Sequence, residues 1–164
     1  MQYRLSVKER PAQWVATILF EAGPHDAGNR VESTLTEVWS TLEANGAVPA
    51  GPPFSLSHHA RPGDVPASPP WTIESGFPIE REMRLPPPVH VHQLPAGPVL
   101  STVHEGDYDH LVNAYLALDA ELLTRGLATA AAPREIYLTD PVAEPDPSKW
   151  RTQIEWPLEE PVDV

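Results

Sequence analysis

The sequence predicts an α+β domain in which two similar halves share one antiparallel sheet. Two segments carry helical apolar stripes that end at glycines, and the segments between them alternate apolar and polar residues as strands do. The stretch from Gly46 to Ser57 lines up with the stretch from Gly126 to Tyr137. We therefore expect two ββαββ-like halves, related by a pseudo-twofold axis, at about 1–82 and 88–160 of a single domain covering 1–164.

The first helix is expected from about Asn29 to Asn45. Asn29 and Glu32 have the spacing of a capping box, which satisfies free N–H groups at a helix start. Gly46 follows at the position where a left-handed residue closes a helix. The apolar stripe consists of Val31, Leu35, Val38 and Leu42, with Trp39 at its edge.

The second helix is expected from about Asp109 to Arg125. Arg125 lies near the negative end of the helix dipole, and Gly126 closes the helix. Its apolar stripe consists of Leu111, Tyr115, Leu118 and Leu122. Each helix thus has one apolar stripe, but the sequence does not say which face of the sheet the helices cover.

The remaining ordered segments are typical of strands, and proline-rich stretches join them. Proline removes backbone donors, so the stretches at 49–53, 62–70, 86–88 and 141–147 should stay outside the sheet. Pro95 to Pro98 is a turn signal, and it predicts a hairpin that sets His90 opposite Thr102. The expected strands are 3–9, 14–21, 54–57, 71–77, 89–94, 99–104, 134–139 and 151–156.

Composition excludes several classes of function. The chain has 164 residues and a net charge of −12, from 23 acidic and 11 basic side chains, which argues against a nucleic-acid-binding surface. It has no cysteine, so disulfides and thiolate catalysis are excluded. No apolar run reaches the length that spans a bilayer, and the first ten residues lack the apolar core of a secretory signal. We expect a cytoplasmic protein that needs no cofactor.

One strand, Arg134 to Thr139, carries an unusual pair of polar residues. Alternation places Glu135 and Tyr137 on one face, where the other half of the repeat has Ser55 and Ser57. If this face is internal, the carboxylate needs a partner or a raised pKa, and it could bind a cation or act as a general acid or base. If the face is solvated, the pair is ordinary strand surface.

A set of motifs in the second half resembles the GyrI-like small-molecule-binding family, the effector-binding domain type of some AraC- and MerR-type multidrug regulators. The set is His104-Glu105-Gly106-Asp107-Tyr108, Gly126, Glu135 to Pro141, Trp150-Arg151-Thr152 and Trp156-Pro157. The resemblance implies two strand–helix–strand–strand modules, one curved sheet, and two helices flanking a central groove. It also implies that Glu135 lies in that groove.

Aromatic side chains are the expected walls of the site, because their faces attract delocalised cations and stack on flat ligands. Tyr137 shares a face with Glu135 and is the strongest candidate. The alternative for each aromatic is ordinary core packing. The candidate ligand-binding residues are Glu135, Tyr137, Trp39, Tyr108, Tyr115, Trp71 and Trp156, with Glu135 and Tyr137 also candidate catalytic residues.

Metal, nucleotide and serine-hydrolase chemistry find little support in the sequence. His90 and His92 share a strand face, but the predicted hairpin leaves His104 only diagonal to them, so no metal site is expected. There is no P-loop, no dinucleotide fingerprint and no Gly-x-Ser-x-Gly elbow.

Three functions remain open for a domain that starts directly in its first strand, with no helix-turn-helix before it. The first is a stand-alone protein that binds hydrophobic, planar or cationic small molecules. The second is a small hydrolase of reactive, cyclopropanoid-like natural products, a branch that the resemblance implies uses the same glutamate. The third is an interaction module that modulates a partner protein such as gyrase, although no particular partner is indicated.

Overall fold

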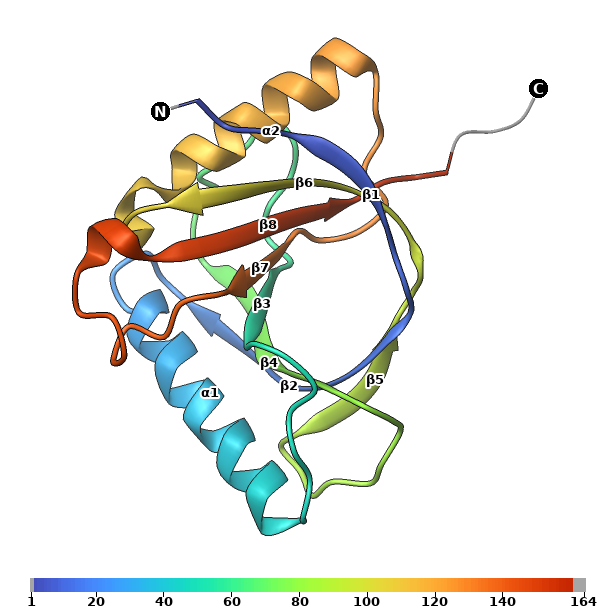
Figure 1. The fold of residues 1–164 in the computed structure, drawn as a ribbon, viewed down its shortest axis with the longest axis vertical. Helices are drawn as coiled ribbons and strands as arrows, with labels where there is room; N and C mark the ends of the chain where they lie inside the picture. The colour runs from blue at the N-terminus through green and yellow to red at the C-terminus, as the bar shows by residue number, and fades with distance from the viewer. Residues whose placement is uncertain (1, 161–164) are drawn as a thin grey trace.

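A computed structural model describes residues 2–160 and contains one antiparallel sheet with two helices (Figure 1). Its elements, in chain order, are β1 (Ser6–Arg10), β2 (Gln13–Ala22), α1 (Ala27–Ala44), β3 (Phe54–Ser57), β4 (Trp71–Ile79), β5 (His90–Leu94), β6 (Gly97–Glu105), η1 (Tyr108–His110), α2 (Leu111–Arg125), β7 (Arg134–Tyr137), η2 (Pro147–Lys149) and β8 (Arg151–Pro157). The α+β class and the curved sheet expected from the sequence are confirmed.

The eight strands run in the order β1-β6-β8-β7-β3-β4-β2-β5, and every neighbouring pair is antiparallel. The order is symmetric about the central pair β7 and β3. β1, from the first half of the chain, lies at the edge of the second-half strands β6, β8 and β7. β5, from the second half, lies at the edge of the first-half strands β2, β4 and β3. The two halves of the chain thus exchange their outermost strands within a single curled sheet (Figure 1).

The prediction of a hairpin between residues 89–94 and 99–104 is wrong. β5 pairs with β2, placing His92 opposite Val15, whereas β6 pairs with β1 and β8. The turn signal in Pro95 to Pro98 is real, but it directs the chain from one edge strand to a strand near the opposite edge of the sheet. His90 therefore lies opposite Thr17 and not opposite Thr102.

Both helices begin or end close to the predicted residues. α1 starts before Asn29, because Asp26 occupies the N-cap position and its carboxylate accepts the Gly23 N–H at 2.7 Å; the predicted capping box is therefore wrong. At the other end, Gly46 has a φ of 70° and follows the cap residue Asn45. α2 ends as predicted, with Gly126 in the left-handed conformation.

The two helices pack on the same face of the sheet. Val38 and Leu42 of α1 are fully buried against Phe77 of β4, while Leu118 of α2 is buried against Ile154 of β8. Strand alternation puts Ser75 on the same face as Phe77, and the register then runs across the sheet from Ser75 through Ser55 and Glu135 to Ile154. Glu135 therefore lies on the helix-bearing face, between the two packed regions.

The inner face of the curl has its own core and its own buried carboxylate. Val15, Phe54, Leu56 and Ile136 form the apolar cluster. Glu74 accepts hydrogen bonds from Thr17 at 2.6 Å and His58 at 2.9 Å, and it also contacts His92. Burial alone would raise the pKa of Glu74, but the hydrogen bonds from His58, Thr17 and His92 outweigh it and hold the pKa at about 2.

This network predicts an acid-sensitive contribution to stability from Glu74. Its folded-state pKa of about 2 lies below the ordinary value of 4.5, so its stabilisation is present above pH 4.5 and is lost as the pH falls towards 2. We expect Glu74→Gln to unfold at lower urea concentration than wild type at pH 7, with the gap closing across that window. Parallel urea curves from pH 7 to pH 2 measure it, and a gap that widens on acidification would contradict the assignment.

Neither α1 nor α2 is long and apolar enough to cross a membrane.

Candidate functional site

Glu135 is held by hydroxyl groups from three different elements. Tyr115 of α2 donates to its Oε2 at 2.5 Å, Ser57 of β3 donates to the same oxygen at 3.3 Å, and Tyr137 donates to Oε1 at 3.4 Å. Tyr115 reaches Glu135 because the stripe of α2 faces the sheet, and Ser57 reaches it because β3 and β7 are neighbours. The Tyr115 contact is the tightest, so the helix fixes the carboxylate more firmly than the strands do.

The surroundings of Glu135 favour its protonated form. Burial raises the pKa of the Glu135 carboxyl, while the hydrogen bonds from Tyr115, Ser57 and Tyr137 lower it only in part. Burial and the adjacent carboxylate raise the pKa of Tyr115 and Tyr137 well above 10, so both phenols stay protonated donors. No ion pair to Glu135 is found within residues 2–160. When Glu135 ionises, its negative charge therefore has no compensating cation among these residues.

Aromatic rings adjoin the carboxylate on one side. The ring of Tyr108 lies 5.8 Å from that of Tyr137 in an edge-to-face arrangement, and 5.0 Å from that of Trp150. Tyr108 is 38% exposed, so this aromatic group reaches the surface. Delocalised cations and flat rings interact favourably with such faces.

The other three predicted wall residues pack against side chains other than Glu135. Trp39 is 48% exposed on α1 and packs edge-on against Phe77, with 5.6 Å between ring centroids. Trp156 is almost fully buried and packs edge to face against Tyr115, with 6.0 Å between the ring centroids. Trp71 stacks on His59 and donates to the Ala67 carbonyl, and no contact joins it to Glu135.

Sequence reasoning did not assign a role to Trp150 or to Ser57. Trp150 directly follows η2 in an irregular connection, so no periodicity marks it, and its indole N–H donates to the Glu144 carbonyl at 2.6 Å. Ser57 was noted only as the repeat equivalent of Tyr137, yet its hydroxyl contacts the carboxylate. Ser57 reaches Glu135 because β3 pairs with β7, and the sequence alone does not reveal that pairing.

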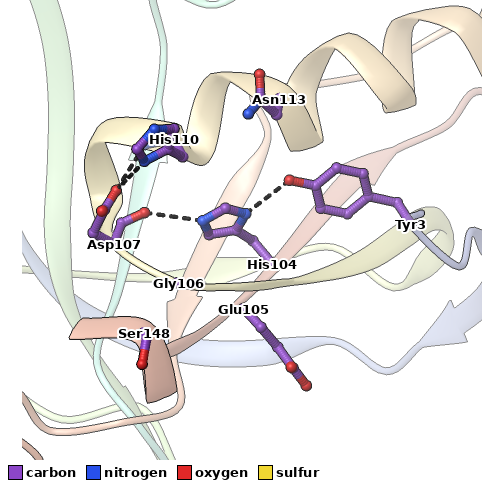
Figure 2. Close-up of a pocket in the computed structure, with 8 residues that line it drawn as sticks. All are labelled: Tyr3, His104, Glu105, Gly106, Asp107, His110, Asn113 and Ser148. Carbon is purple, nitrogen blue, oxygen red and sulfur yellow. Dashed lines mark hydrogen bonds and ion pairs between the residues drawn. The ribbon is translucent and has the colours of Figure 1, made fainter. Parts of the chain in front are cut away.

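Two surface hollows are found among the described residues, and neither is lined by Glu135. The first, of about 390 Å³, is shown in Figure 2 and is bordered by Tyr3, His104, Asp107 and His110 among others. In neutral His104, Nε2 donates to the Asp107 carbonyl and Nδ1 accepts from the Tyr3 hydroxyl, each at 2.9 Å, so both ring nitrogens are occupied. The second, of about 380 Å³, is bordered by residues 58–62, 129–132 and Trp156.

No cluster of three or more His, Asp or Glu side chains within the described range 2–160 is arranged to hold a metal ion. The imidazoles of His58 and His92 each bind an oxygen of Glu74 and do not converge on a shared point.

A family model for the GyrI-like small-molecule-binding domain matches residues 70–159, more than half of the chain. The chain belongs to the GyrI-like family. The match covers η1, α2, β7 and β8, the elements that supply Glu135, Tyr115, Tyr137 and Tyr108. None of the curated proteins matches the chain significantly in sequence.

Solved structures share this GyrI-like fold. The C-terminal domain of EcmrR superimposes with a TM-score of 0.85 at 21% identity, over 98% of this chain and 100% of that one. In the EcmrR–DNA complex the match has the same score and identity and spans 97% of this chain but 58% of the longer EcmrR chain.

Two more distant structures share the fold at lower scores. A hydrolase encoded by lin2189 from Listeria innocua matches with a TM-score of 0.67 at 12% identity, over 95% of this chain and 92% of that one. SAV2435 bound to tetraphenylphosphonium matches with a TM-score of 0.61 at 10% identity, over 97% and 94%. At these identities the likeness establishes the fold alone.

Proposed function

We propose that this GyrI-like domain binds planar or hydrophobic cationic small molecules beside Glu135. The observation that carries the proposal is the uncompensated carboxylate among hydroxyl groups and aromatic rings on the helix-bearing face. A buried carboxylate without a cationic partner is costly, and a bound cation would supply that partner.

The hydroxyl contacts restrict the kind of cation that fits. Tyr115, Ser57 and Tyr137 fill three of the roughly four acceptor positions of the carboxylate, so a compact ammonium would find about one free position there. A cation with spread charge needs no such hydrogen bond and interacts by Coulomb attraction at longer range. Tyr108, which is 38% exposed and meets Tyr137 edge to face, offers an aromatic surface on which a flat ligand could stack. SAV2435 binds tetraphenylphosphonium, a cation of this kind, on the same fold.

Proton release on binding tests the proposal directly. A cation stabilises ionised Glu135, so it lowers a pKa that burial has raised and drives off a proton when the free carboxyl is partly protonated. We expect affinity for rhodamine 6G to fall as the pH is lowered through that raised pKa, approaching about tenfold per pH unit below it.

Calorimetry in buffers of different ionisation enthalpy measures the proton count. Glu135→Gln serves as the control, because it keeps every histidine but has no proton to release at this position. Equal pH dependence in both proteins would show that another group is responsible.

A second candidate function is hydrolysis of strained electrophiles, and the burial of Glu135 favours it, because burial raises the pKa of the carboxyl towards the acid form that this chemistry needs. The acid form of Glu135 would donate a proton to the atom released by ring opening, and the attacking water would return a proton to the carboxylate. Mass spectrometry of a cyclopropanoid substrate incubated with the protein follows this reaction. Turnover that survives Glu135→Ala would remove the carboxyl from the mechanism.

A further inference from the structure

The connection between β3 and β4, residues 58–70, reaches out of its own half of the sheet to α2 (Figure 1). The backbone N–H of Gly63 donates to Oδ2 of Asp119 on α2 at 3.0 Å. Val65 packs against the apolar cluster that contains Tyr115 and Leu118. This proline-rich segment, called the strap below, therefore joins the first half of the chain to the helix of the second.

The strap is held at its root more firmly than at its tip. Near β3, the His58 N–H donates to the Thr72 carbonyl at 2.9 Å, and the Arg61 guanidinium donates to the His58 and Ala60 carbonyls. At the tip, Asp119 is the anchor on α2. Its second oxygen, Oδ1, is buried and has no hydrogen-bond partner among residues 2–160, so the contact leaves part of a carboxylate unsatisfied.

The strap begins beside one donor of Glu135, and its tip contacts the helix that carries another. Ser57, the last residue of β3, precedes it directly, and Tyr115 lies one helical turn before Asp119 on α2. The hollow of about 380 Å³ opens at its root, between residues 58–62 and residues 129–132. The strap consequently packs, through Val65, in the same apolar cluster as Tyr115, the tightest donor to Glu135.

We propose that Asp119 latches the strap onto α2, and that release of the latch opens the Glu135 site to larger ligands. The inference rests on the proposed function for its ligand, but the motion itself can be measured without one. Asp119→Ala removes the acceptor of the Gly63 N–H, whereas Asp119→Asn retains an oxygen that can accept it.

Hydrogen exchange followed by mass spectrometry tests the latch. We expect the backbone amides of Gly63, Asp64 and Val65 to exchange about tenfold faster in Asp119→Ala than in wild type, and close to the wild-type rate in Asp119→Asn. Val65→Ala loosens the strap from its own side and should also speed exchange there, while peptides of α1 keep their protection. Unchanged strap exchange in Asp119→Ala, or equal acceleration in α1, would overturn the latch.

Two probes of different size test the consequence for binding. If the open state admits larger ligands, its increased population in Asp119→Ala should raise affinity for rhodamine 6G by up to the same factor of about ten, and leave affinity for 1-methylquinolinium unchanged. An equal change in affinity for both probes would overturn the claim that the latch selects ligands by size. Failure of both probes to bind wild type would instead overturn the proposed function, and strap exchange would still decide the latch.

Discussion

Glu135→Gln is expected to weaken binding of rhodamine 6G roughly 10- to 100-fold at pH 8, the scale of one lost charge interaction in a partly desolvated site. The substitution preserves shape, and Tyr115 can still donate to the amide oxygen, so the change isolates the charge. Fluorescence titration gives the two dissociation constants. Thermal unfolding of both proteins confirms that the fold is kept.

Glu43→Gln is the matched control for this experiment. Glu43 is exposed near the end of α1, so its replacement removes the same charge from the surface and should leave the affinity within about twofold of wild type at moderate salt. Equal loss in both variants would indicate general attraction to an acidic protein. No loss in Glu135→Gln would end the charge argument.

Gly76→Ala is expected to lower the free energy of unfolding by at least about 3 kcal/mol. Gly76 lies in β4 between β3 and β2, where a Cβ would fall 1.9 Å from the Ala16 carbonyl oxygen and 2.8 Å from the Thr17 Cα. Both are backbone atoms, so no side-chain rotation relieves the clash and the pairing of β2 with β4 must shift. Urea unfolding curves give the difference.

Gly28→Ala provides the opposite outcome from the same chemical change. Gly28 lies in α1, and a Cβ there meets no atom within 4 Å, so lower backbone entropy in the unfolded chain should stabilise the protein by a few tenths to about 1 kcal/mol. Equal urea midpoints for Gly76→Ala and wild type would show that β2 and β4 can move apart at Gly76 more easily than their register implies.

Local signals in the sequence predicted the elements well but not their partners. The stripe that ends at Gly126 marked α2, because periodicity and a left-handed closing residue are both local. The Pro95 to Pro98 turn was also recognised, yet it led to the wrong pairing, since a turn does not determine whether the next strand returns beside the last. The observed pairing follows from the exchange of β1 and β5 between the two halves. That exchange joins segments far apart in the sequence, so no local signal marks it.

Alternation places Glu135 on one face with Tyr137, and the family resemblance implies a central groove, but the sequence does not say which face the helices cover; the register shows that Glu135 lies on the helix-bearing face. The hydroxyl of Tyr115 did not follow, because a stripe position predicts only packing, whereas this side chain packs on Trp156 and also donates to Glu135. The binding roles of all seven candidate residues stay predictions that ligand titration would test: Glu135, Tyr137, Trp39, Tyr108, Tyr115, Trp71 and Trp156.

The exchanged edge strands bear on how this molecule can be divided. A fragment ending near residue 82 would keep β1 but lose β6, its sole partner in the sheet, and would leave one side of β2 open where β5 belongs. Such a piece exposes unsatisfied backbone donors and acceptors and is prone to aggregate. The two halves should therefore become native only when co-expressed, which makes the chain a natural candidate for a split reporter that reassembles from complementary fragments.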